Sequence, residues 1–402
     1  MLNQDIIREA TRLTRAGRLA QATALLQSML RGESTPDATL RTSRTTLTKR
    51  EPPIIDAKAD HIEETDRSHS ARAPSAQPRM LRELLDRTRQ RSGRGLRDAL
   101  KRAPPSTSDI VPAGARFIDG SYSNQAGSRT YRLFIPSRYQ GQPLPLLVML
   151  HGCTQSPDDF AAGTRMNFIA EEQNCLVVYP AQRSEANRAK CWNWFRTADQ
   201  QRGKGEPSLI AGITRQIMRN YSVDPKRVYV GGLSAGAAAA AIMGTTYSDL
   251  YAAIGIHSGL ACGAAIDLPS AFAAMQQGAR TDDRAISNEG PPVPTIVFHG
   301  DQDITVHPNN GDQVLEQSMR MTRTKKQVHR GQVHGGHAYT RTIHTDASGR
   351  SIFEHWKIHG AGHAWSGGSP AGSYTDPRGP DATKEMLRFF LEHSLPLHRG
   401  EN

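Results

Sequence analysis

The stretch that decides the fold is Gly232-Leu233-Ser234-Ala235-Gly236. It follows a strand-like run, 227–230 (Arg-Val-Tyr-Val), and precedes a helical stretch of small residues, 237–244. This context predicts a tight strand-to-helix turn that lifts the serine hydroxyl clear of a sheet, with glycines where side chains would collide with neighbouring backbone. A bare G-x-S-x-G also arises by chance, so the strand and the helix make Ser234 the candidate nucleophile.

Outward from this turn, short apolar runs alternate with helical patterns from about residue 114 onward. The pattern indicates extended segments near 116–122, 130–135, 144–150, 175–179, 227–231, 252–256, 294–299 and 352–358. It indicates helices near 206–221, 236–246, 310–320 and 381–393. Strands that alternate with helices predict an α/β fold, with a mostly parallel sheet, helices on both faces and the active site at the strand ends.

A second signal, His151-Gly152-Cys153-Thr154-Gln155, comes directly after the apolar run 144–150. A serine nucleophile on such a turn needs two backbone N–H groups to stabilise the oxyanion that forms during attack. One comes from the residue after the nucleophile, here Ala235, and the other from the loop after the third strand, for which Cys153 is the candidate. His151 is interpreted as structural.

The other two catalytic candidates follow later strands. The apolar run 293–298 ends in a turn with two acids, and Asp303 is the candidate that orients a histidine, while Asp301 shapes the turn. A glycine-rich loop carries His363, the candidate general base, whereas His359 is interpreted as a packed or surface residue. The order Ser, Asp, His along the chain is that of α/β-hydrolases.

Two weaker features of the sequence concern substrate contacts and metal binding. The aromatic run 191–195 contains Trp192 and Trp194, which as exposed side chains near the strand ends would grip an apolar substrate, with core packing as an almost equal alternative. Three histidines of a predicted hairpin region fit no firm metal-ligand pattern: His334, His337 and His344. We therefore expect no metal.

Charge and composition separate the ends of the chain. The 402 residues are 37% hydrophobic, with a mean hydropathy of -0.55 and a net charge of +11. Residues 1–105 hold 21 Lys and Arg against 13 Asp and Glu, so +8 of this charge lies there. Charge alone does not choose between nucleic acid, an anionic lipid surface and an acidic partner.

The sequence predicts a cytoplasmic protein. No run reaches the ~18 apolar residues of a membrane span, and charged residues interrupt the N-terminus where a signal peptide would be apolar. Free thiols are then the expectation for the four cysteines, with a pair such as Cys153 and Cys191 as the alternative.

Three segments are expected. Residues 1–31 show the pattern of a helical hairpin, and 32–105 that of a disordered, basic linker. Within the linker, 79–102 combines leucines with arginines, which fits a solvated, partly helical segment or an amphipathic helix that lies on an interface. Residues 106–402 form the expected α/β-hydrolase domain.

Five segments together resemble a known family. They are Leu-His-Gly-Cys-Thr-Gln (150–155), Cys-Trp-Asn-Trp-Phe (191–195), Arg-Val-Tyr-Val-Gly-Gly-Leu-Ser-Ala-Gly (227–236), His-Gly-Asp-Gln-Asp (299–303) and Gly-Ala-Gly-His-Ala-Trp-Ser-Gly-Gly (360–368). The chain is similar over roughly 114–396 to polyhydroxybutyrate depolymerases, whose relatives include feruloyl and acetyl-xylan esterases.

This resemblance implies hydrolysis of short-chain polyhydroxyalkanoate esters through an acyl-enzyme, with Ser234, Asp303 and His363 as the triad and Cys153 at the oxyanion position. It implies no cofactor. The lack of a signal peptide and of a C-terminal polymer-binding module favours intracellular granules, held through 79–102, or soluble oligomers.

Two other hypotheses about the function remain open. One is a feruloyl or acetyl-xylan type of carbohydrate esterase. The other is a granule-surface or nucleic-acid-binding protein with an inactive hydrolase scaffold. The complete set of candidates argues against inactivity, and the basic region lacks the interleaved aromatics of single-strand binders, so no nucleic acid is expected.

Overall fold

A ten-stranded sheet runs through the molecule, in the order β1-β2-β4-β3-β5-β6-β7-β10-β9-β8. The computed structural model describes residues 105–279, 292–320 and 322–396. The strands of this sheet are β1 (Arg116–Asn124), β2 (Gly127–Ile135), β3 (Leu144–Leu150), β4 (Leu176–Pro180), β5 (Val223–Leu233), β6 (Ala253–His257), β7 (Thr295–Gly300), β8 (Lys325–Gln332), β9 (Ala338–Thr345) and β10 (Ser351–Ile358). Two short strands, β11 (Trp365–Ser366) and β12 (Thr375–Asp376), pair in a separate two-stranded sheet.

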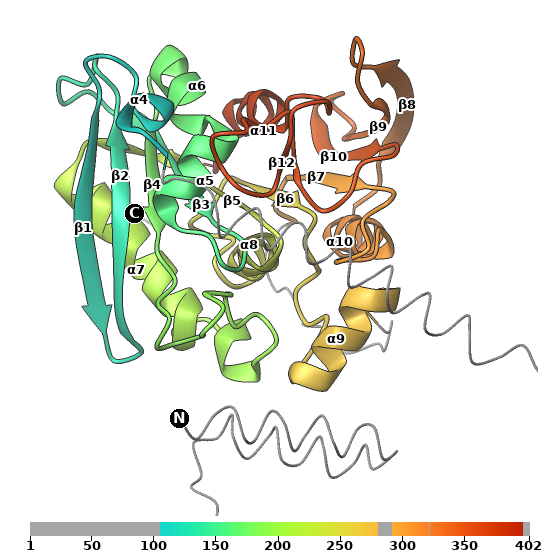
Figure 1. Cartoon of the computed structure of the whole chain (residues 1–402), viewed down its shortest axis with the longest axis horizontal. Helices are drawn as coiled ribbons and strands as arrows, with labels where there is room; N and C mark the ends of the chain where they lie inside the picture. Colours follow the sequence, from blue (N-terminus) through green and yellow to red (C-terminus); the bar gives the residue numbers. More distant parts are fainter. Residues whose placement is uncertain (1–104, 280–291, 321, 397–402) are drawn as a thin grey trace, which may run out of the picture. The chain divides into compact units, whose positions relative to one another are not determined.

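The middle of this sheet is parallel and its two edges are antiparallel. β4, β3, β5, β6, β7 and β10 pair in parallel, so their carboxyl ends meet at one edge of the sheet. The long hairpin β1-β2 pairs antiparallel with β4, and the β9-β8 hairpin pairs antiparallel with β10 (Figure 1). The loops after β5, β7 and β10 therefore leave from the same side.

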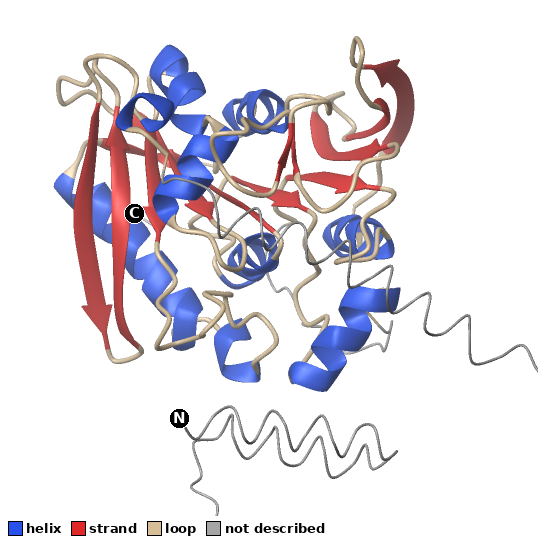
Figure 2. Cartoon of the chain, in the orientation of Figure 1, coloured by secondary structure: helices blue, strands red, loops and turns tan. Residues whose placement is uncertain are grey.

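Helices cover both faces of the sheet (Figure 2). They are α4 (Thr107–Ile110), α5 (Pro157–Thr164), α6 (Met166–Gln173), α7 (Gly205–Asn220), α8 (Ala235–Thr246), α9 (Leu268–Gln277), α10 (Asn309–Met319) and α11 (Ala382–Leu391), with a 3-10 turn at Thr197–Gln200. Alternate residues of one strand pack against different helices: Val148 of β3 lies in the cluster with α7 and α8, and Met149 in the cluster with α5, α6 and α11. Because side chains alternate across a strand, a strand buried on both faces is apolar throughout, as β3 is.

A buried carboxylate joins α11 to the sheet. Glu354 of β10 is fully buried and accepts hydrogen bonds from the guanidinium groups of Arg341 (3.0 and 3.0 Å) and Arg388 (2.9 and 2.8 Å), and from the Trp356 indole (3.1 Å). Burial would raise the pKa of Glu354, but these hydrogen bonds and both positive charges hold the pKa below its usual value.

The expected fold class is confirmed, and the expected strands and helices lie within a few residues of the observed ones. The sequence pattern did not indicate α4, α5, α6 or α9, nor the short strands β11 and β12. The expectations for 1–31, for most of 32–105 and for 79–102 fall outside the described residues. Within the described ranges, no helix is both long and apolar enough to cross a membrane.

Candidate active site

Ser234 lies at a sharp turn between β5 and α8. Its backbone has φ 57° and ψ -120°, a conformation that non-glycine residues rarely adopt, and its N–H donates to the carbonyl of His257 at 2.9 Å. Strained residues of this kind cluster at functional sites. The turn is the predicted strand-turn-helix, and it presents Ser234 at the carboxyl end of the central strand.

The glycines beside Ser234 permit close approach of the loop after β3. A Cβ on Gly236 would lie 2.1 Å from the Leu150 carbonyl oxygen, and a Cβ on Gly232 would lie 2.5 Å from the same atom. Neither position has room for a side chain, as the sequence predicted. The turn is thereby held against the end of β3. Next to it lies the segment 151–155, the candidate oxyanion loop, which carries Cys153.

Asp303 and His363 meet across neighbouring parallel strands. Asp303 follows β7 and His363 follows β10, and the imidazole Nδ1 of His363 donates to Oδ2 of Asp303 at 2.7 Å. A proton on Nδ1 leaves the Nε2 lone pair free to accept a proton. The structure thus brings together two of the predicted residues in the relationship that a general base and its orienting acid require.

The carboxylate of Asp303 is buried and firmly held. Its Oδ1 accepts backbone N–H groups from Thr305 and Val306, both at 2.9 Å, and its Oδ2 lies 3.4 Å from Nε2 of His299. Burial would raise the pKa of Asp303, but the hydrogen bonds from His299 and His363 hold this pKa well below its usual range. Asp303 therefore stays ionised under all ordinary conditions.

Asp301 and His359 form a second pair, which holds the loop that carries His363. Oδ2 of Asp301 lies 2.9 Å from Nδ1 of His359, and Oδ1 accepts the Gly360 N–H at 2.8 Å. Nε2 of His359 lies 2.9 Å from the Thr340 hydroxyl. The geometry agrees with the interpretation that Asp301 shapes a turn, and this pair contacts neither Asp303 nor Ser234 in any recorded hydrogen bond of the described residues.

Sequence reasoning missed two buried histidines that support the site. His257, at the end of β6, accepts the Ser234 N–H with its carbonyl oxygen and the Ser366 N–H with its ring Nε2 (3.0 Å), so it connects the serine turn with the loop after His363. His299, in β7, donates from Nε2 to the Val306 carbonyl at 2.8 Å beside Asp303. Only their positions at or near strand ends could have indicated them.

The candidate oxyanion loop lies beside Ser234. A Cβ built on Gly152 would lie 3.6 Å from the Cβ of Ser234. Ala235 is the first residue of α8, where a helix leaves its N–H groups without intrahelical partners and favours negative charge. Among the hydrogen bonds of the described residues, none uses the N–H of Cys153. Cys153 and Ala235 thus remain the candidate oxyanion donors, on two segments that adjoin Ser234.

His151 has the predicted structural role. Its ring is fully buried, with Nδ1 donating to the Gly152 carbonyl at 2.8 Å and Nε2 accepting the Gln182 N–H at 3.0 Å. These bonds fix the start of the loop.

Both tryptophans are buried, which corrects the expectation of exposed aromatic side chains. Trp192 is 0% exposed, and its indole N–H donates to the His151 carbonyl at 3.1 Å. Trp194 is 6% exposed and lines a small hollow with Glu206, Ile210 and Met243. The alternative of core packing describes both side chains, because they belong to the apolar cluster that α7 and α8 form with the sheet.

Cys153 and Cys191 form a disulfide, while Cys175 and Cys262 are free and buried. The sequence had left this pairing as the alternative to free thiols. Disulfides are typical of oxidising compartments, so the bond weighs against the expected cytoplasmic location, which stays a prediction.

Within the described ranges, no group of three or more His, Cys, Asp or Glu residues is arranged to hold a metal ion.

Buried neutral histidines should make the fold sensitive to acid. Burial lowers the pKa of His151 to about 4 and that of His257 to about 3. The unfolded chain binds protons at these histidines below about pH 6.5 and the folded protein does not, so stability is complete above that pH and is lost as the pH falls. We expect urea unfolding to show about 2–4 kcal/mol less stability at about pH 5 than at about pH 7.5.

The variant His257→Asn should lose less stability over the same interval. Equal stability of the wild-type protein at both pH values would contradict the assignment of neutral, buried imidazoles.

The mostly parallel sheet with helices on both faces defines the class of fold, which is that of the α/β-hydrolases. Residues 129–330 match the model of the family described as esterase PHB depolymerase, which is half of the chain. The chain belongs to this family. The acetyl xylan esterase from Aspergillus awamori shares the fold, with a TM-score of 0.54 and 18% identity, over 69% of this chain and 99% of that protein.

Two curated relatives carry different substrate names. Poly(3-hydroxyalkanoate) depolymerase C of Paucimonas lemoignei is 33% identical over 228 residues, 54% of this chain and 54% of that protein. An acetylxylan esterase of Coprinopsis cinerea is 30% identical over 155 residues, 38% of this chain and 41% of that protein. The chain thus spans about half the length of the curated relatives that it matches.

Proposed function

We propose that this chain hydrolyses esters through an acyl-enzyme on Ser234, and that its substrates are short-chain polyhydroxyalkanoates or their oligomers. The observation that carries the mechanism is the 2.7 Å hydrogen bond between His363 and Asp303, on the same edge of the sheet as the Ser234 turn. In this mechanism His363 removes the serine proton and then gives it to the leaving alcohol, and Asp303 stabilises the imidazolium.

The oxyanion of the tetrahedral intermediate would accept hydrogen bonds from the N–H groups of Cys153 and Ala235. Preformed donors of this kind stabilise charge as it develops and need no reorganisation at the moment of reaction. Because the donors are backbone groups, the sulfur of Cys153 can form a disulfide without loss of this role. No step of the proposal calls for a cofactor.

The substrate class rests on similarity to the Paucimonas lemoignei depolymerase, and the acetylxylan esterase supports the carbohydrate-ester alternative. Turnover should be compared on amorphous polyhydroxybutyrate granules, their soluble oligomers, p-nitrophenyl butyrate, methyl ferulate and acetylated xylan. We expect kcat/KM on hydroxybutyrate oligomers to exceed that on methyl ferulate by at least about tenfold. An enzyme distinguishes two substrates by how strongly it binds their transition states, and the ratio of the two kcat/KM values measures that difference. The reverse ranking would select the carbohydrate-ester alternative.

The N-terminal extension is proposed to decide where the enzyme acts. Its charge and the Leu/Arg pattern of 79–102 would favour an anionic or apolar boundary such as a granule surface. A chain that begins at Ser106 should keep kcat/KM on p-nitrophenyl butyrate within about twofold, because an α/β-hydrolase domain has its own core. It should bind granules less than the full chain does, and added salt should reduce the difference. Equal sedimentation of both proteins with granules at low salt would contradict this role.

A further inference from the structure

The candidate oxyanion loop is fastened to a second loop, residues 181–193, which carries none of the proposed catalytic groups. The Cys153–Cys191 disulfide joins the two loops covalently. The Thr154 N–H donates to the Ala189 carbonyl at 2.6 Å, next to the disulfide. The bonds of His151 to Gln182 and Trp192 add two more connections, so the position of the first loop depends on that of the second.

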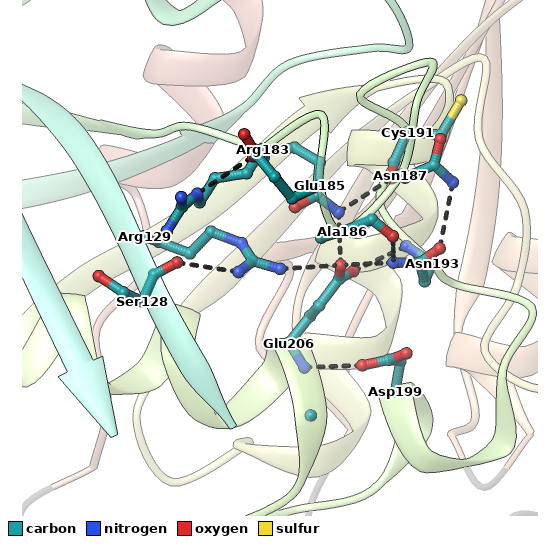
Figure 3. A network of polar contacts seen from close by, with 12 residues as sticks. Ser128, Arg129, Arg183, Glu185, Ala186, Asn187, Cys191, Asn193, Asp199 and Glu206 are labelled. Carbon is teal, nitrogen blue, oxygen red and sulfur yellow. Dashed lines mark hydrogen bonds and ion pairs between the residues drawn. The ribbon is translucent and has the colours of Figure 1, made fainter. Parts of the chain in front are cut away.

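The second loop is held in turn by one carboxylate, that of Glu206, in the first turn of α7 (Figure 3). Its Oε2 accepts the backbone N–H of Asn193 at 2.7 Å, and its Oε1 accepts the Asn193 side-chain amide at 2.8 Å. The Gln182 side-chain amide donates to both Oε1 of Glu206 and the Cys191 carbonyl, the latter at 2.9 Å. Every residue from Cys191 to Asn193 therefore has a bond that leads to Glu206 or to the oxyanion loop.

Glu206 is buried although a buried carboxylate adds little to the stability of a hydrophobic core, so its position calls for another explanation. It is 5% exposed, and Arg129 lies 3.3 Å away as its only recorded cationic partner among the described residues. The pKa of Glu206 is raised above its usual value, mainly by burial and also by the charge of Asp199, although the bonds from Gln182 and Asn193 and the charge of Arg129 oppose this. A buried carboxylate gives little net stability compared with apolar packing, but it fixes geometry because all its donors must stay in place.

We propose that Glu206 is a positioning residue for the oxyanion hole: it holds the 191–193 segment, and the Cys153–Cys191 disulfide passes that position to the N–H of Cys153. This inference rests on the proposed function. Glu206 touches no reacting atom, and it would act by keeping the Cys153 N–H aimed at the oxygen of the tetrahedral intermediate.

The substitution Glu206→Gln keeps the shape and replaces one acceptor oxygen by a donor, which would face an N–H of Asn193 or Gln182. We expect kcat on p-nitrophenyl butyrate to fall by about tenfold, part of the 10²–10³ that loss of a whole oxyanion donor costs. KM should stay within about twofold, because a donor that acts only on the transition state does not hold the substrate. A trifluoromethyl ketone inhibitor, whose adduct places an oxyanion in the hole, should bind about tenfold more weakly.

Glu354→Gln is the matched control. Glu354 is also a buried glutamate held by arginine, but it joins α11 to the sheet and has no bond to either loop. It should lower stability and leave kcat and inhibitor binding within about twofold of wild type. If Glu206→Gln behaves like Glu354→Gln, losing stability alone, the proposal is overturned. The milder Asn193→Ala, which removes one bond to Glu206, should show a smaller effect of the same kind and decides the matter if Glu206→Gln does not fold.

A double-mutant cycle tests the path through the disulfide. The variant Cys153→Ser/Cys191→Ser should itself lose kcat. Reduction of the wild-type protein should lower kcat to the same level, because Cys175 and Cys262 are already free thiols and reduction therefore changes only the Cys153–Cys191 bond. In that variant, the effect of Glu206→Gln on kcat should shrink to about threefold or less, because the covalent connection is gone and hydrogen bonds such as those of His151 and Thr154 then join the two loops, and residues that act through a shared connection are not additive. A full tenfold effect there would overturn the role of the disulfide. Failure of the proposed function would look different: the wild-type protein would hydrolyse no ester, or would remain active without Ser234.

Discussion

Replacing Ser234 by alanine is expected to lower kcat at least ~10³-fold on every ester that the wild-type protein hydrolyses, with the fold intact. The reason is that the covalent route disappears with the hydroxyl, and only the oxyanion donors and substrate binding remain to accelerate attack by water. The measurement is kcat on p-nitrophenyl butyrate, together with the midpoint of thermal unfolding. KM should change little, because the serine oxygen acts in the transition state.

A matched serine controls for the loss of a hydroxyl. Ser270 lies in the first turn of α9 and bonds to Asp267, and among the described residues it has no recorded bond to the candidate site. Ser270→Ala should therefore leave kcat within about twofold and lower stability only through the lost capping bonds of α9. Activity of Ser234→Ala near that of wild type would show that the hydroxyl is not the nucleophile.

The second large effect concerns the two aspartates. Asp303→Asn is expected to lower kcat by about 10³–10⁴, because an amide N–H facing Nδ1 of His363 favours the wrong tautomer and no charge remains to stabilise the imidazolium. Asp301→Asn should cost less than about tenfold, since the bonds that the Asp301 carboxylate makes to described residues, to His359 and to the Gly360 N–H, hold the loop and do not reach the Asp303–His363 pair.

The pair of substitutions is informative because both change one carboxylate to an amide on the same turn. The ratio of the two effects therefore removes general consequences of lost charge. If Asp301→Asn proved the more damaging, the roles of the two residues would have to be exchanged.

Most of the fold could be predicted because its signals are local. The run 144–150 is apolar at every position because β3 is buried on both faces, and the glycines around Ser234 are required by contacts with Leu150. The Asp303–His363 pairing followed from the order of motifs, since parallel neighbouring strands bring their carboxyl ends together.

What could not be predicted depends on contacts between distant segments. Nothing in the local pattern shows that Glu206 is buried, because a glutamate in the first turn of a helix is usually solvated. The run 191–195 looks like an exposed aromatic loop until the disulfide and the bonds to Glu206 fold it inward, which buries Trp192 and Trp194. His257 and His299 likewise have no signal of their own.

The most direct test of the proposed mechanism is to label the full-length protein with a fluorophosphonate and to locate the adduct by peptide mass spectrometry. The serine oxygen would displace the fluoride, and the tetrahedral phosphorus would resemble the intermediate that the oxyanion donors stabilise. The account predicts one adduct per chain, on Ser234, with loss of esterase activity in proportion to labelling. Full activity after complete labelling, or an adduct on another residue that accounts for the inactivation, would contradict it.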